Sequence, residues 1–132
     1  NWERVDTRGF AKLGTGLTES SGVYSFPSTG HYLIQFIAFL SNSNAEERFC
    51  KAFIEVTEDN SSFNSANDTR TSLAGSSGQR NGSIHCSHVF DVTNTTNDKF
   101  KVGVDHSDSN TVVHGDSNTN ETYIIVTKLA ET

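Results

Sequence analysis

Five histidines are the first candidates for metal ligands or proton-transfer groups in this 132-residue chain. No two of them form the His-x-x-x-His pair that a helix would bring to one zinc ion. His85 and His88 are three residues apart, and on a strand such a pair faces opposite sides, so the two cannot chelate one ion. We expect surface or hydrogen-bonded roles for all five: His31, His85, His88, His106 and His114.

The segment Asp105–Asn110 is the best candidate for a metal site. It offers carboxylate and amide oxygens, the hard ligands that Ca²⁺ prefers, with Asp105 and Asp108 as the candidate ligands. Its spacing is not that of an EF-hand loop, and no Glu follows where that loop has its bidentate ligand. We therefore favour a solvated turn over a calcium site, and we expect no other cofactor.

Residues for covalent or acid–base catalysis are not arranged in a recognisable way. No Gly-x-Ser-x-Gly elbow occurs, and Gly14-Thr-Gly16 lacks the Lys of a phosphate-binding loop. Glu46 and Glu47 are interpreted as the solvated start of a strand, not as the carboxylate pair of a glycosidase. The sequence predicts a protein that is not an enzyme.

The two cysteines, Cys50 and Cys86, alternate with apolar residues, where a thiol tends to be inert. Both belong to the inward-facing set of their strands, so they can face each other across a core. Alternation fixes the face but not the height along the strand. The sequence leaves open whether they form one disulfide or remain two buried thiols.

Net charge and hydropathy narrow the range of partners. The formal charge is −6, and no Lys/Arg stripe exists to neutralise phosphates, which disfavours nucleic acid and anionic lipid. The longest apolar run, Tyr32–Leu40, is too short for membrane insertion. Because the chain starts at Asn1, we expect a processed product or a domain of a longer polypeptide. Five Asn-x-Ser/Thr sequons would matter only in a eukaryotic host: Asn60, Asn67, Asn81, Asn94 and Asn120.

Strand patterns recur along the chain between turn clusters, whereas helix patterns are nearly absent. This predicts one all-β domain over residues 1–132, an antiparallel β-sandwich, with residues 1–16 as an N-terminal strand or arm. The polar stretch 59–82 is expected to hold one irregular strand around Arg70–Leu73 between two mobile loops. The other strands are expected within residues 22–27, 31–40, 46–57, 83–93, 100–104, 111–113 and 123–129.

Two strands carry more apolar side chains than one core requires. Residues 31–40 are apolar on both alternating sets, which predicts a central strand with one face under a neighbour or a partner subunit. On residues 46–57 the set opposite Cys50 mixes Phe with charges, which suits a contact surface. Only 33% of the chain is hydrophobic, so burial in an oligomer would help it. The predicted subunit interface consists of Tyr32, Phe36, Phe49, Phe53, Tyr123 and Ile125.

Two segments carry a resemblance to a known family. Gly22-Val-Tyr-Ser-Phe-Pro-Ser-Thr-Gly-His-Tyr-Leu-Ile34 resembles the entry into the central strand of C1q/TNF-like jelly rolls, and Asn120-Glu-Thr-Tyr-Ile-Ile-Val-Thr-Lys-Leu129 is similar to their last strand. The resemblance implies a jelly roll of C1q/TNF-like type. It also implies a compact homotrimer in which one sheet of each subunit packs on the threefold axis, with the end loops exposed.

More narrowly, the chain resembles C1q/TNF-like domains found in structural proteins of marine bacteriophages. The signs are Phe26-Pro-Ser-Thr-Gly30, Gly115-Asp-Ser-Asn-Thr-Asn120 and the ending Lys128-Leu-Ala-Glu-Thr132. This resemblance implies a virion structural module, either the knob of a fibre or tail or a head-decoration protein, that presents loops to the host. The alternative is a secreted or cell-surface C1q-like ligand or glycan-binding module, which the sequons and a disulfide would favour.

Loops at the ends of the sandwich are the expected binding surface, because the strands are committed to packing. Besides copies of itself, the expected partners are a host receptor or glycan and other virion proteins. The location would be the virion surface or, in the alternative, the extracellular space. The candidate binding residues are Arg70, Gln79, Arg80, Asn81 and His106.

Overall fold

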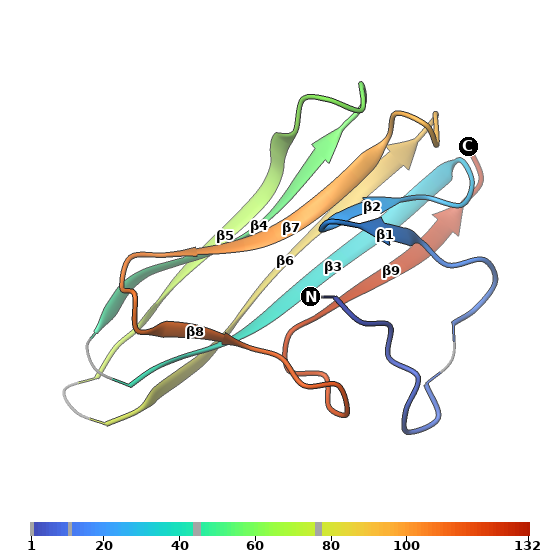
Figure 1. The fold of residues 1–132 in the computed structure, drawn as a ribbon. Helices are drawn as coiled ribbons and strands as arrows, with labels where there is room; N and C mark the ends of the chain where they lie inside the picture. Colours follow the sequence, from blue (N-terminus) through green and yellow to red (C-terminus); the bar gives the residue numbers. More distant parts are fainter. Residues whose placement is uncertain (1, 11, 44–45, 76–77) are drawn as a thin grey trace.

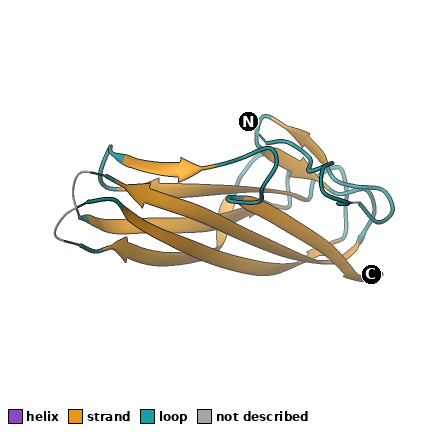
Figure 2. Ribbon diagram, turned by 90° about the horizontal axis from the view of Figure 1, so that it is seen from below, coloured by secondary structure: helices purple, strands orange, loops and turns teal. Residues whose placement is uncertain are grey.

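The computed structural model describes residues 2–10, 12–43, 46–75 and 78–132 and contains strands and loops within these ranges (Figures 1 and 2). No helix in this part of the chain could span a membrane. The strands are β1 (Thr18–Ser20), β2 (Val23–Ser25), β3 (Gly30–Asn42), β4 (Glu47–Thr57), β5 (Asn64–Leu73), β6 (Arg80–Val92), β7 (Lys99–His106), β8 (Thr111–His114) and β9 (Tyr123–Ala130).

Two antiparallel sheets form a β-sandwich, as the alternation predicted. We call the first the charged sheet; its strand order is β1-β2-β7-β4-β5. The second, the β3 sheet, has β6 on one side of β3 and both β8 and β9 on the other. Figure 1 shows β8 and β9 following each other along β3. The order is consistent with a jelly roll, and β3 is the central strand that its doubly apolar pattern predicted.

The core lies between the sheets and is filled from alternating positions. On β3 the buried set is Tyr32, Ile34, Phe36 and Ala38, and on β6 it includes Ile84, Cys86 and Phe90. His88 also faces inward, and burial lowers the pKa of its imidazole. The inward sets predicted for β4 and β6 are thus confirmed.

Aromatic rings close the end of the core near the β2–β3 turn. The rings of Tyr24 and Phe100 stack with centroids 4.9 Å apart, and Phe26 lies 4.6 Å from Tyr32 and 5.7 Å from Phe90. Such pairs add stability beyond the area they bury. The aromatic residues of the 22–34 motif are therefore core residues.

Gly30, in the same motif, is required by the backbone. Its φ is +139°, and a Cβ there would lie 2.5 Å from the carbonyl oxygen of Ala130. We expect Gly30→Ala to lower the free energy of unfolding by about 2 kcal/mol or more. The matched control is Gly115→Ala, where an added Cβ meets nothing within 4 Å, so a change within about 0.5 kcal/mol is expected. Urea unfolding measures both; equal stability of the two variants would contradict this role.

The secondary structure corrects one expectation, decides between the two alternatives given for residues 1–16, and adds one strand. The stretch 59–82 is not mainly loop, because β5 pairs with β4 along ten residues. No described residue of segment 1–16 is in a strand; this arm instead places Trp2 against the rings of Tyr24 and Phe36, at 6.3 and 6.1 Å. The short strand β1 was not predicted. Residues 1, 11, 44, 45, 76 and 77 of the predicted arm and turns lie outside the described residues.

Candidate functional site

The two sheets have outer faces of opposite character. Ion pairs link neighbouring strands on the outer face of the charged sheet, which we call the charged face. Lys51 Nζ lies 2.6 Å from the Asp105 carboxylate. One step along, Lys101 Nζ lies 2.8 Å from the Glu55 carboxylate. Cross-strand pairs of opposite charge stabilise a sheet face that stays in contact with water.

Phe49 and Phe53 lie on this charged face, outward as predicted. The ring of Phe53 covers Gly103, where an added Cβ would come within 2.4 Å of it, and Lys51 Nζ is 4.9 Å from the ring centroid. Arg70 lies 5.8 Å from the ring centroid of Phe49. Both aromatic rings thus already have partners within their own chain.

The outer face of the β3 sheet carries several exposed or half-buried apolar side chains among polar ones. Its centre is the outward set of β3, which contains Leu33, Ile37 and Phe39. Val89 of β6 is 52% exposed, and Ile125 of β9 is 45% exposed. The register places Gln35 beside Ile125 and Ile37 beside Tyr123. We call this surface the β3 face: Leu33, Gln35, Ile37, Phe39, Val89, Tyr123 and Ile125.

Polar side chains also lie on the β3 face: Ser87 is opposite Gln35 on one side of β3, and Thr127 is opposite Leu33 on the other. At one end His31 Nε2 lies 3.7 Å from the Asp91 carboxylate, an exposed pair. At the other end His114 Nε2 lies 2.6 Å from the hydroxyl of Ser41. His85 pairs with Ile37 and is exposed. Exposed apolar side chains gathered on one face among polar ones are typical of a protein-binding surface.

The predicted interface set is divided by the fold. Tyr123 and Ile125 lie on the β3 face, but Tyr32 and Phe36 are 3% and 1% exposed and belong to the core. The prediction for these two residues was wrong, because alternation does not say which apolar set of a doubly apolar strand faces inward. The polar residue Gln35 marks the outward set of β3, because a polar side chain is more often found on the exposed set of a strand than in the core.

The predicted binding residues gather in part. Asn42 of β3 is opposite both Arg80 and Thr111, which places Gln79, Asn81 and His106 near one end of the sandwich. Arg80, however, is buried, and its guanidinium donates to the carbonyl oxygens of Gly75 (2.9 Å) and Gly78 (3.2 Å), so it is not available to a ligand. Arg70 lies apart on β5, 3.5 Å from the Asp68 carboxylate.

The candidate calcium ligands are engaged separately. Asp105 pairs with Lys51 on the charged face, whereas Asp108 accepts hydrogen bonds from the backbone and side-chain N–H groups of Asn110. These bonds hold the pKa of Asp108 below its usual value. Within the described residues, no group of three or more His, Cys, Asp or Glu side chains could hold a metal ion.

Glu47 is the polar residue that the sequence interpretation placed wrongly. It is fully buried, and its carboxylate accepts hydrogen bonds from the backbone N–H groups of Phe49 (3.0 Å) and Asp108 (2.8 Å). Ser107 donates from both its backbone and its hydroxyl, and Thr111 donates from its hydroxyl at 2.6 Å. Since every one of these partners is a donor, the site fixes a carboxylate and joins the start of β4 to the β7–β8 turn.

The pKa of Glu47 reflects this cage of donors. Burial alone would raise it, but the hydrogen bonds, led by those from Ser107 and Thr111, outweigh burial and lower the pKa to about 2. A carboxyl group that stays ionised and surrounded by donors cannot act as a general acid at neutral pH. Glu47 is therefore a structural residue.

Cys50 and Cys86 are both buried and both free thiols. Burial is the main cause that raises the pKa of each to about 11. Thiolate, the reactive form, is therefore scarce at neutral pH. The structure favours the second alternative left open above, two inert core thiols.

No protein-family model matches the chain, and no curated protein matches it in sequence.

Proposed function

We propose that this domain is a non-enzymatic structural module that forms a homotrimer on a virion surface. It would be the knob of a phage fibre or tail, or a head-decoration protein, and would present loops and turns for attachment to the host. The observation that carries the proposal is the contrast between the two outer faces of the sandwich. One carries ion pairs between neighbouring strands, and the other, the β3 face, carries exposed apolar side chains such as Val89 and Ile125.

The β3 face is better suited to contact with another subunit than to exposure to water. Large exposed apolar patches on soluble domains mark interaction surfaces. Val89 and Ile125 are about half exposed in the single chain and stand on either side of β3. Packing this face on a threefold axis would cover them in each subunit, which is the arrangement that the C1q/TNF-like resemblance implies.

The virion assignment rests on the narrower resemblance, that of segments 26–30, 115–120 and 128–132 to domains of marine phage structural proteins. A trimeric sandwich suits the tip of a fibre, because the symmetry axes coincide and the loops stay exposed.

Mass spectrometry of purified particles and of the particle-free medium from one culture tests the location. We expect peptides of this domain in the particle fraction, in a fixed ratio to other virion proteins. Their presence only in the particle-free medium would contradict the virion assignment and support the secreted ligand instead.

A further inference from the structure

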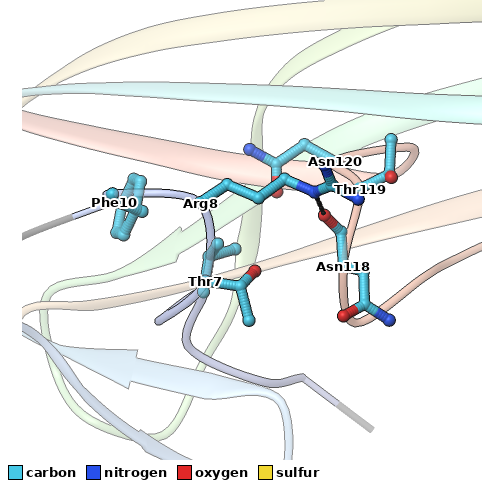
Figure 3. A pocket seen from close by; sticks show the side chains of 8 residues that line it. Thr7, Arg8, Phe10, Asn118, Thr119 and Asn120 are labelled. Atoms are coloured by element: carbon cyan, nitrogen blue, oxygen red, sulfur yellow. Dashed lines mark hydrogen bonds between the residues drawn. The ribbon is translucent and has the colours of Figure 1, made fainter.

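A pocket of about 490 Å³ lies between the N-terminal arm and the β8–β9 loop (Figure 3). Thr7, Arg8 and Phe10 line it from the arm, and Asn118–Asn120 line it from the loop. The volume is within the range of small-ligand sites. None of its lining residues belongs to the β3 face or to the binding residues predicted from the sequence.

Hydrogen bonds hold both walls of the pocket in place. On the arm, the N–H of Phe10 donates to the carbonyl of Thr7 at 3.1 Å, across a tight turn in which Arg8 has a φ of +54°. On the loop, the Asp116 carboxylate accepts from the backbone N–H groups of Asn118 (2.6 Å) and Thr119 (2.8 Å). The left-handed conformation of Arg8 is rare for a residue other than glycine, and such outliers gather at binding sites.

Arg8 joins the two walls. Its Nε donates to the carbonyl oxygen of Asn118 at 2.9 Å, drawn as the dashed line in Figure 3. This bond spans 110 residues of sequence and fixes the guanidinium against the loop. A ligand would therefore meet a largely formed site and would lose little affinity to ordering it.

The pocket offers an apolar ring and unused polar groups. Phe10 is 51% exposed, so its ring is open to a ligand. Asn120 also lines the pocket and is exposed, so its side-chain amide is open to a ligand. Within the described residues, Arg8 forms no ion pair, and its only hydrogen bond is made by Nε, which leaves both Nη groups as donors.

We infer that this pocket binds a saccharide that carries a carboxylate. A sugar ring has an apolar C–H face, which suits Phe10, and hydroxyl groups, which suit the amide of Asn120. Among the described residues that line the pocket, Arg8 is the only one with a charged side chain, and a guanidinium with two free Nη groups matches a carboxylate. The inference rests on the proposed attachment role and names the chemistry of its ligand.

Titration by NMR with matched acidic and neutral probes tests the inference. The pairs are tetragalacturonate with its methyl ester, and sialyllactose with lactose. We expect the folded protein to bind at least one acidic probe about 10-fold more tightly than its neutral match. This factor corresponds to the affinity gained from one favourable contact between charged groups. Arg8→Gln is expected to abolish this preference.

Phe10→Ala is expected to weaken binding of the preferred probe about 10-fold. The ring is half exposed, so its removal leaves the fold intact, which thermal unfolding checks. The matched control is Phe49→Ala, another exposed ring, on the charged face, which should bind as the unmodified protein does. The inference would be overturned if the protein bound neither acid, or if it bound the acid and its neutral match with equal affinity. It would also be overturned if Phe10→Ala bound the preferred probe as tightly as the unmodified protein does.

The subunit count, measured on the same samples, separates the two proposals. A trimer that binds no acidic saccharide would contradict only the proposed saccharide site. A monomer that binds an acidic saccharide would contradict only the proposed trimer.

Discussion

Replacing Glu47 by Gln is expected to lower the free energy of unfolding by about 3 kcal/mol at pH 7, because a buried carboxylate that accepts charge-assisted hydrogen bonds loses its charge. The amide that replaces one carboxylate oxygen also sets a donor against the donors of Asp108 or Thr111. Urea unfolding followed by circular dichroism measures the effect. The matched control is Glu46→Gln, whose side chain is half exposed, with an expected change within about 0.5 kcal/mol.

The pH dependence distinguishes this role from simple packing. The folded-state pKa of Glu47, about 2, lies below the ordinary value of 4.5. Its stabilisation is therefore complete above pH 4.5 and is lost as the pH falls toward 2. The stability difference between the unmodified protein and Glu47→Gln should narrow over that window. A difference that stays constant from pH 7 to pH 2.5 would contradict the ionic role.

Introducing a charge at the centre of the β3 face has the second large expected effect. Ile125→Glu would place one carboxylate per subunit beside uncharged neighbours, since the register puts Gln35 and then Ser87 next to it across the sheet. A buried, unpaired carboxylate costs several kcal/mol. We expect the association constant to fall by about 100-fold or more, which corresponds to about 3 kcal/mol. Sedimentation velocity over a concentration series measures it.

The control for this variant is Phe49→Glu on the opposite sheet. Phe49 is exposed and lies beside Arg70, so a carboxylate there gains a neighbouring cation and stays in water. We expect its oligomeric state to equal that of the unmodified protein. If Phe49→Glu dissociates the assembly and Ile125→Glu does not, the interface lies on the charged sheet instead.

Much of the fold follows from period-2 alternation, which identified β3, β4, β6 and β9. Alternation did not identify strands whose side chains lack an apolar pattern. β5 has mostly polar, exposed side chains and is held by backbone pairing with β4, so no apolar alternation marks it. The arm 2–10 was uncertain for the opposite reason: Trp2 packs on the core without any strand around it.

Glu47 could not be placed from the sequence because a β-bulge changes the alternation. Counting back from the buried Cys50 places Arg48 inward and Glu47 outward. The structure has an irregular register between Glu47 and Cys50, and two consecutive exposed residues, Arg48 and Phe49, separate the buried ones. A bulge inserts one residue and reverses the faces before it. Nothing in the local residue types distinguishes Glu47 from its neighbour Glu46.

The pocket beside the arm was missed for a different reason. Arg8 and Phe10 are about 110 residues from Asn118–Asn120, and each segment by itself has the composition of an ordinary loop. Their proximity depends on where the arm meets the β8–β9 loop, which no pattern in the sequence encodes.

Sedimentation velocity of the unmodified protein at micromolar concentration tests the central claim, self-association through the β3 face, most directly. The claim predicts one species with three times the chain mass of 14.4 kDa, converted toward single chains by Ile125→Glu. A stable species of 14.4 kDa at every concentration would contradict it.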